Sequence, residues 1–374
     1  MRIGIDAHMI GEHETGNESF IKGVVHALHQ VDRVNQYYVF VQQKYQDILS
    51  YLERPGFQLV SLSSANALIR NVITLPRNVR KYELDALFAT YTVPLFSYCP
   101  VVVAVHDLSY IHFPEFFPPR VRLQLSAMIP WSIRRAAHVT ALSEFSKQDL
   151  IDQYNIPGEK ITVTYLSVDD RFQPMERNLA LAQIRQKYPV GERFILAVGN
   201  LQPRKNIPRL LKAFSQLHRS RQINHQLVVV GQDLWYAQNI YQAVQELSVD
   251  DKVIFTGYVD DEELPLLYNA ADLFVYPSLF EGFGIPVLEA MRCGTPTVTS
   301  NTSSLPEVIG HSALSFDPYN VDAIADVIYS IVVDEERRKM LGKQCLQRSQ
   351  VFSWEDTAKR LIRVFEGVTA MRHS

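Results

Sequence analysis

Two glutamates flank a glycine-rich turn in the segment "SLFEGFGIPVLEAMRCG", where seven residues separate Glu281 from Glu289. Gly282 and Gly284 allow the backbone to turn tightly, and the free amides at the beginning of the helix that follows favour an anion such as phosphate. With a carboxylate on either side, the turn fits a nucleotide diphospho-sugar, whose ribose and sugar lie at opposite ends of the diphosphate. On spacing alone an alternative stays open, in which Glu281 caps the turn and Glu289 pairs with Arg292.

Two adjacent cations follow another apolar run. Arg204 and Lys205 lie in "AVGNLQPRKN", which also contains Gly199. If this run is a strand, both cations stand at its C-terminal end, where they would neutralise a diphosphate leaving group as its charge develops. Preorganised charge of this kind is worth roughly 10²–10³ in rate per donor. A solvated basic turn is the other interpretation of these residues.

The first half of the chain adds two candidate loops. "HETGNESF" carries Gly16 and Asn17, and "VVVAVHDLSY" ends its apolar run at His106. No G-x-G-x-x-G fingerprint occurs, which counts against a nicotinamide or flavin enzyme. Gly16 either lets the backbone approach a phosphate or serves as a turn residue. His106 either hydrogen-bonds a sugar hydroxyl, acts as an acid or base, or packs in a turn.

Short apolar runs alternate with helical stretches, a pattern typical of parallel sheets covered by helices on both faces. The expected strands are 2–7, 37–42, 57–62, 86–90, 101–107, 138–143, 194–200, 226–231, 253–259, 272–278 and 295–300. The pattern pauses after Pro174, and 374 residues suit two domains. We therefore expect two α/β domains, 1–172 and 173–354, with ligands bound beyond the C-terminal strand ends.

The composition is that of an ordinary globular protein, with 47% hydrophobic residues, 21% charged residues and a net charge of −3. This charge argues against bulk nucleic-acid binding, and three scattered cysteines give neither a disulfide framework nor a zinc pattern. No signal peptide is evident, and no segment reaches the roughly 18–20 apolar residues that span a bilayer. We expect a cytoplasmic protein that could still rest on a membrane.

Taken together, these segments resemble the retaining GT-B glycosyltransferases of glycosyltransferase family 4, the group 1 glycosyltransferases. The E-x7-E pair of that family falls on Glu281 and Glu289, and "VGNLQPRKN" looks like its diphosphate-binding loop. Further similar motifs are "VHDLSYIHFPEFFP", "SEFSKQDL" and "GYVDDEELPLLYNAADLFVYPS", so the resemblance covers nearly the whole chain. Members often have "TGIGRY" in the first loop where this chain has "TGNESF", so we expect a specialised acceptor side.

The resemblance implies two Rossmann-like, doubly wound domains that face each other across a cleft, with a C-terminal helix, 355–374, completing the first. It implies an acceptor in the first domain, a nucleotide-sugar donor held mainly by the second, and no metal or cofactor. Glu289 would bind the ribose. The catalytic residues that it implies, at the sugar and the diphosphate, are Glu281, His106, Arg204 and Lys205. The other implied substrate contacts are Gly16, Asn17, Gly199, Tyr258, Val259, Gly282, Phe283, Gly284 and Ile285.

The expected reaction is the transfer of a hexose with retained anomeric configuration. Family members show no evident carboxylate nucleophile, so we favour a front-face displacement in which the departing diphosphate takes the acceptor's proton. UDP-glucose is the preferred donor on family frequency and GDP-mannose the second, with a glycan or a polyprenyl-diphosphate-linked saccharide as acceptor. The alternatives are a nucleotide-sugar epimerase, which needs no acceptor, and a sugar-nucleotide-binding regulator without turnover.

Basic residues gather in the first domain, some of them near the aromatic residues Trp131, Phe116 and Phe117. They are Arg70, Arg77, Arg80, Lys81, Arg120, Arg122, Arg134 and Arg135. Such clustering predicts peripheral contact with the anionic inner face of the cell membrane. Ordinary solvated helix faces are the alternative.

Overall fold

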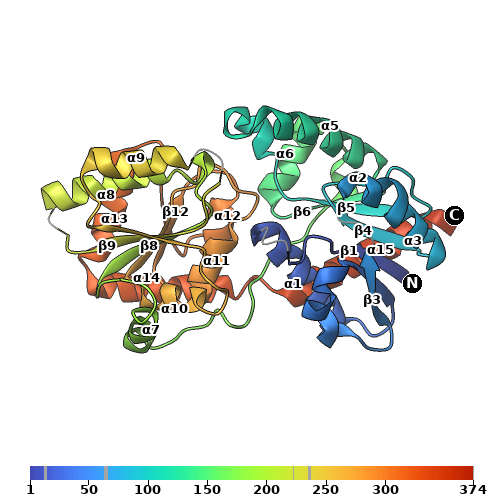
Figure 1. The fold of residues 1–374 in the computed structure, drawn as a ribbon, viewed down its shortest axis with the longest axis horizontal. Helices are drawn as coiled ribbons and strands as arrows, with labels where there is room; N and C mark the ends of the chain where they lie inside the picture. Colours follow the sequence, from blue (N-terminus) through green and yellow to red (C-terminus); the bar gives the residue numbers. More distant parts are fainter. Residues whose placement is uncertain (12–14, 63–65, 222, 235–236, 374) are drawn as a thin grey trace. The chain divides into compact units, whose positions relative to one another are not determined.

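The computed structural model divides the chain into two compact units (Figure 1). The residues that it describes are 1–11, 15–62, 66–221, 223–234 and 237–373. The first unit consists of Met1–Leu108, Pro119–Ser167 and Phe352–Ser374, and the second of Ser109–Pro118 and Val168–Val351. The short segment 109–118 thus groups with the second unit, whereas the domain bounds expected from the sequence include it in the first domain.

A seven-stranded parallel sheet runs through the described part of the first unit, in the order β3-β2-β1-β4-β5-β6-β7. Its strands are β1 (Arg2–Asp6), β2 (Gln36–Gln42), β3 (Phe57–Leu62), β4 (Ala86–Thr90), β5 (Val101–Val105), β6 (His138–Ala141) and β7 (Ile161–Val163). The central strands β4 and β5 are buried along their whole length. Burial on both faces explains why their sequences are continuous apolar runs.

The C-terminal helix α15 (Trp354–His373) packs beside α1 (Thr15–Val31) in the first unit. Gly23 of α1 leaves room for the indole of Trp354, because a Cβ at that position would lie 2.0 Å from the ring. Phe365 of α15 meets Phe88 of β4 edge to face, with ring centroids 6.1 Å apart. The last helix therefore covers a sheet formed by the beginning of the chain. The other helices here are η1 (Gln43–Leu52), α2 (Ala67–Ile69), η2 (Arg70–Thr74), α3 (Leu75–Lys81), α5 (Pro119–Arg135), α6 (Glu144–Tyr154) and η4 (Gly158–Lys160).

The described part of the second unit holds a six-stranded parallel sheet in the order β10-β9-β8-β11-β12-β13. Its strands are β8 (Phe194–Val198), β9 (Gln226–Val230), β10 (Val253–Gly257), β11 (Leu273–Tyr276), β12 (Thr297–Ser300) and β13 (Leu314–Phe316). Its helices are α4 (Ser109–His112), η3 (Pro114–Phe116), α7 (Arg177–Ile184), η5 (Pro203–Lys205), α8 (Ile207–Arg221), α9 (Gln238–Leu247), α10 (Leu264–Ala270), α11 (Ile285–Arg292), α12 (Leu305–Ile309), α13 (Val321–Val332) and α14 (Glu335–Ser349).

In each sheet the strand order reverses beside the first strand of the unit. β1 lies between β2 and β4, and β8 lies between β9 and β11. Ligands of such sheets bind beyond the carboxyl ends of the strands at this switch point. In the second unit these strands end at Val198 and Tyr276, just before the two segments that carry the candidate charges. The prediction of two Rossmann-like parallel sheets is confirmed.

None of the helices within the described ranges is long and apolar enough to cross a bilayer.

Candidate active site

The carboxylate of Glu281 lies between two cations in the second unit. Its Oε2 is 2.7 Å from an Nη1 of Arg204, and its Oε1 is 2.7 Å from Nζ of Lys205. The two basic side chains are 13% and 12% exposed and that of Glu281 is 8% exposed. The interpretation of Arg204 and Lys205 as a solvated basic turn is therefore wrong. The cluster carries one net positive charge, which suits an anionic ligand.

The local backbone explains why these residues meet. The turn η5 (Pro203–Lys205) follows β8, and the loop with Glu281 follows β11, its neighbour in the sheet. The amide of Leu279 donates a hydrogen bond of 2.9 Å to the carbonyl of Arg204, and an Nη1 of Arg204 donates to the carbonyl of Phe280. Adjacent parallel strands deliver both loops to one edge of the sheet, and these bonds fix them together.

Two hydroxyl groups also donate hydrogen bonds to the carboxylate of Glu281. Ser278 and Tyr276 donate to Oε1 of Glu281 over 2.5 and 3.0 Å. Nζ of Lys205 lies 2.6 Å from the hydroxyl of Tyr276 and also lies over its ring. Ser303 accepts the amide of Glu281 at 2.9 Å. Two cations and two hydroxyl groups thus hold the carboxylate of Glu281 in place.

The electrostatic balance keeps Glu281 ionised. Burial by itself would raise the pKa of this carboxyl, but Arg204 and Lys205 outweigh burial and lower the pKa to about 2. At neutral pH the side chain is a fixed anion that accepts hydrogen bonds. This state suits a residue that positions sugar hydroxyls, and it is unsuited to a general acid.

The helix α11 begins at the predicted turn. Gly284 precedes it with φ +103°, and a Cβ there would lie 2.8 Å from a methyl of Leu305, so glycine is required twice over. The amides of Gly284 and Ile285 have no hydrogen-bond partner among the residues described. Gly282 and Phe283 lie buried in the same loop. The two amides and the helix dipole point to an anion site here.

Glu289 lies on α11 and has a different electrostatic environment. The hydroxyl of Tyr268, a fully buried residue of α10, donates to Oε2 of Glu289 over 2.8 Å. Burial raises the pKa of Glu289 to about 7, although this hydrogen bond lowers it in part. Glu289 therefore gains or loses a proton near neutral pH, whereas Glu281 does not.

The remaining predicted residues of the second unit lie at neighbouring strand ends. Gly199 follows β8 with φ +149°, and a Cβ there would lie 3.3 Å from Cε of Lys205. Tyr258 and Val259 follow the edge strand β10; Tyr258 is exposed and Val259 is buried. The amide of Gly231, after β9, donates to the carbonyl of Gly257 at the end of β10. The ends of β8, β9 and β10 thus line up beside the charged cluster.

The first unit brings together two of its predicted residues. Nδ1 of His106, after β5, lies 2.8 Å from Oδ1 of Asn17 on α1, while its buried Nε2 has no hydrogen-bond partner among the residues that the structure describes. Burial lowers the pKa of His106 to about 4, so its imidazole is neutral at pH 7. Gly16 is exposed in the first turn of α1. His13 and Glu14 of the same predicted loop lie outside the described residues.

A buried charged group at the switch point of the first sheet was not anticipated. Asp6 ends β1, with its Oδ1 2.9 Å from Nδ1 of His8 and its Oδ2 3.6 Å from Nε of Arg70. Although burial would raise the pKa of Asp6, His8 and Arg70 lower it. Arg70 is 5% exposed, so its assignment to a solvent-facing basic surface is wrong. Arg70 is buried because the ionised carboxylate of Asp6, itself buried, is stable only beside an opposite charge.

Several supporting residues were missed by sequence reasoning. They are Tyr268, Tyr276, Ser278, Ser303 and Ser304. Their signal is weak, since buried Tyr and Ser occur in many cores. Hydroxyl residues five and three positions before a predicted site acid, as in "YPSLFE", were the available hint.

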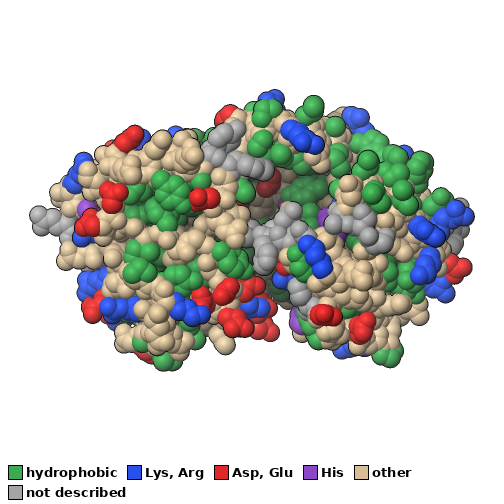
Figure 2. Space-filling model, viewed as in Figure 1, with side chains coloured by type: hydrophobic (Ala, Val, Ile, Leu, Met, Phe, Trp, Pro, Cys, Tyr) green, Lys and Arg blue, Asp and Glu red, His purple; other side chains and the backbone are tan. Residues whose placement is uncertain are grey.

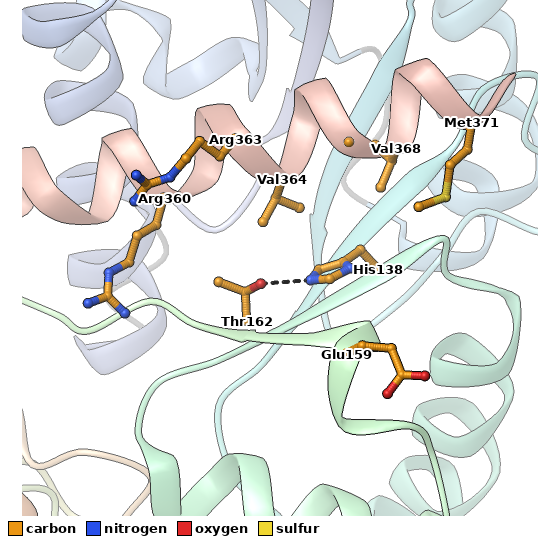
Figure 3. A pocket seen from close by; sticks show the side chains of 9 residues that line it. His138, Glu159, Thr162, Arg360, Arg363, Val364, Val368 and Met371 are labelled. Atoms are coloured by element: carbon orange, nitrogen blue, oxygen red, sulfur yellow. Dashed lines mark hydrogen bonds between the residues drawn. The ribbon is translucent and has the colours of Figure 1, made fainter. Parts of the chain in front are cut away.

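Two cavities lie elsewhere. One, of about 440 Å³, lies between α15 and the β6–β7 edge (Figure 3). There Nε2 of His138 is 2.8 Å from Oγ1 of Thr162, and Arg360 and Arg363 project from α15. The other, of about 380 Å³, adjoins Arg292. Neither is lined by a residue predicted for the site. No group of three or more His, Cys, Asp or Glu that could hold a metal occurs within the described parts of the chain.

Comparison with known families matches both halves of the chain. The model described as Glycosyltransferase Family 4 matches residues 18–172, and the model described as Glycosyl transferases group 1 matches residues 182–348. An O-antigen chain mannosyltransferase of Escherichia coli is 36% identical over 267 residues, which cover 71% of this chain and 70% of that protein. The chain therefore belongs to the group 1 glycosyltransferases of family 4, and it is a glycosyltransferase.

Two further likenesses agree with this family. A serotype-specific mannosyltransferase of Escherichia coli is 35% identical over 243 residues, which cover 64% of this chain and 29% of that protein. The solved structure of sucrose-phosphate synthase from Thermosynechococcus elongatus superposes with a TM-score of 0.81 at 21% identity, covering 99% of this chain and 100% of that one. At this identity the second likeness concerns the GT-B fold alone.

Proposed function

We propose that this glycosyltransferase moves a mannosyl residue from GDP-mannose to a saccharide acceptor, with retention of the anomeric configuration. The observation that carries the proposal is the cluster of Arg204, Glu281 and Lys205 at the switch point, in a chain 36% identical to a protein named as an O-antigen chain mannosyltransferase. The relatives' names favour mannose over the glucose that family frequency suggested. A growing glycan or a lipid-linked saccharide is the acceptor class that fits such names.

The charges of the site support a role in leaving-group departure. A diphosphate that lies against Arg204, Lys205 and the amides at the beginning of α11 meets a net positive, mostly buried environment. As the bond from the anomeric carbon to the diphosphate oxygen breaks, negative charge grows on that oxygen, and the two cations stabilise it. The positive charge of the cluster is moderated in advance by Glu281, which limits the repulsion between its two cations.

Retention follows from a front-face displacement. The acceptor hydroxyl attacks the anomeric carbon from the side that the diphosphate leaves, and its proton passes to the departing diphosphate oxygen. The products are the glycoside and GDP. Glu281 positions sugar hydroxyls, since its pKa of about 2 leaves it ionised and its carboxylate is held by both cations. Glu289, a half-buried residue of α11, accepts the hydroxyls of the ribose.

The test is a donor and product assay on the full chain. GDP-mannose and UDP-glucose are each supplied with a polyprenyl-diphosphate-linked saccharide, nucleoside diphosphate release is measured, and the product's anomeric configuration is read by NMR. We expect release with GDP-mannose that requires the acceptor, and an α-mannoside as product. Nucleoside diphosphate release from UDP-glucose but not from GDP-mannose would overturn the donor assignment. An inverted product would overturn the front-face route, and donor conversion without acceptor would favour an epimerase.

A further inference from the structure

The first unit presents an exposed apolar surface around α2 and the loop that follows β4. Four large apolar side chains are mainly or substantially exposed there: Leu68 (73%), Ile73 (56%), Phe96 (57%) and Leu95 (43%). Isolated exposed apolar residues are ordinary, but a contiguous group marks an interaction site. Figure 2 shows apolar side chains gathered beside Lys and Arg side chains over the region of α2 and α3.

One backbone hydrogen bond and one cation–π contact join the loop after β4 to η2 and α3. The amide of Leu95 donates to the carbonyl of Asn71 over 3.1 Å, which joins the loop to η2. The guanidinium of Arg80, on α3, lies over the ring of Tyr98 at 4.7 Å from its centroid. We call the set formed by Leu68, Ile73, Leu95, Phe96, Arg77, Arg80 and Lys81 the α2–α3 surface.

The charge of the α2–α3 surface has one sign. Arg77, Arg80 and Lys81 are exposed, and residues 54–82 and 86–106 contain neither Asp nor Glu. The acids between these stretches are already engaged. Glu83 pairs with the guanidinium of Arg2 at 2.5 Å, and Asp85 accepts the amide of Arg2 at 2.7 Å. No salt bridge among the described residues joins Arg77, Arg80 or Lys81 to a carboxylate.

We propose that the α2–α3 surface binds the surface of an anionic phospholipid bilayer. The apolar side chains would enter the headgroup region, and the three cations would contact lipid phosphates, the combination typical of interfacial membrane binding. A second copy of the chain fits less well, because a self-complementary contact would bring the same cations together. An acidic protein partner would carry the same negative charge as the bilayer, but binding to it would not require several exposed apolar side chains beside the cations. The proposal does not depend on the donor sugar.

The test is sedimentation of the full chain with vesicles, either of phosphatidylcholine alone or of phosphatidylcholine mixed with phosphatidylglycerol. We expect binding to the mixed vesicles that weakens with added salt. The triple variant Arg77→Glu, Arg80→Glu, Lys81→Glu should lose vesicle affinity roughly 100-fold, since each basic residue near the surface contributes about tenfold or less. The single variant Phe96→Asp should also weaken binding, and it carries the test if the triple variant does not fold.

A matched control lies on α14 of the second unit, where Arg337, Lys343 and the 55% exposed Met340 form another mixed surface. The variant Arg337→Glu, Lys343→Glu, Met340→Asp should keep wild-type affinity for the vesicles. Turnover of a soluble acceptor should be unchanged in this control and in the two variants of the α2–α3 surface. Equal binding to neutral and mixed vesicles, or wild-type vesicle affinity in Phe96→Asp and the triple variant, would overturn the proposal. So would a wild-type dimer that these variants convert to monomer without loss of vesicle binding.

Discussion

Replacing Glu281 by glutamine tests the charge balance of the candidate site. The substitution keeps the shape of the side chain and removes its negative charge, which leaves Arg204 and Lys205 buried without a carboxylate between them. Because the cluster is almost completely buried, solvent screens this interaction little. We expect the second unit to lose stability at neutral pH even in the absence of any donor.

The magnitude follows from the pKa of Glu281. The folded protein lowers this pKa from 4.5 to about 2, and one pKa unit corresponds to roughly 1.4 kcal/mol. The ionised carboxylate thus contributes about 3 kcal/mol at pH 7. A lowered folded-state pKa stabilises above the unfolded pKa, and this contribution is lost as pH falls from 4.5 towards 2. At pH 3 it should have fallen to about 1 kcal/mol.

The assay compares urea unfolding of wild type and Glu281→Gln at pH 7 and pH 3 by circular dichroism. Hydrogen exchange of peptides from β8 and β11 identifies the transition of the second unit. The matched control Glu335→Gln removes a carboxylate that pairs with Lys339 at 2.9 Å on an exposed face, and we expect it to leave unfolding unchanged. A difference below about 1 kcal/mol between Glu281→Gln and wild type at pH 7, or an equal difference at pH 3, would refute the reasoning.

Two other predictions concern the second glutamate and the C-terminal helix. Because the pKa of Glu289 is about 7, the affinity for a nucleoside diphosphate should rise roughly tenfold from pH 6 to pH 8 as the carboxylate ionises, and calorimetry on Glu289→Gln should show this rise abolished. Gly23→Ala should lower the free energy of unfolding by about 1–3 kcal/mol, since the new methyl collides with Trp354. Gly367→Ala on α15, where a Cβ meets nothing within 4 Å, should be neutral or stabilising, and thermal unfolding of both variants beside wild type measures the difference.

Much of the fold was predictable because its signals are local. Continuous apolar runs mark strands buried on both faces, and eleven of the described strands overlap predicted runs, with bounds that differ by two residues at most. β13 was missed because it has three residues and only Phe316 is buried. The glycine turn before α11 was equally local: Gly284 takes a positive φ where the sequence predicted a tight turn.

The partners of the site residues depended on strand order. Lys205 and Glu281 are 76 residues apart, and they meet because β11 inserts beside β8 instead of beside β10. Likewise Asn17 reaches His106 across 89 residues. No local pattern encodes such a choice, since any parallel strand of similar composition could take the same place in the sheet.

The sequence by itself determined the types of group available: an acid pair at fixed spacing, two adjacent cations, and a turn that only glycine permits. Tertiary structure decided their states. Burial raised the pKa of Glu289 to about 7, while two cations held the pKa of Glu281 at about 2. The fold also places Arg70 beside the buried Asp6 instead of on the expected surface. The physical reason is that charge energetics depend on distance and solvent exclusion, and folding sets both.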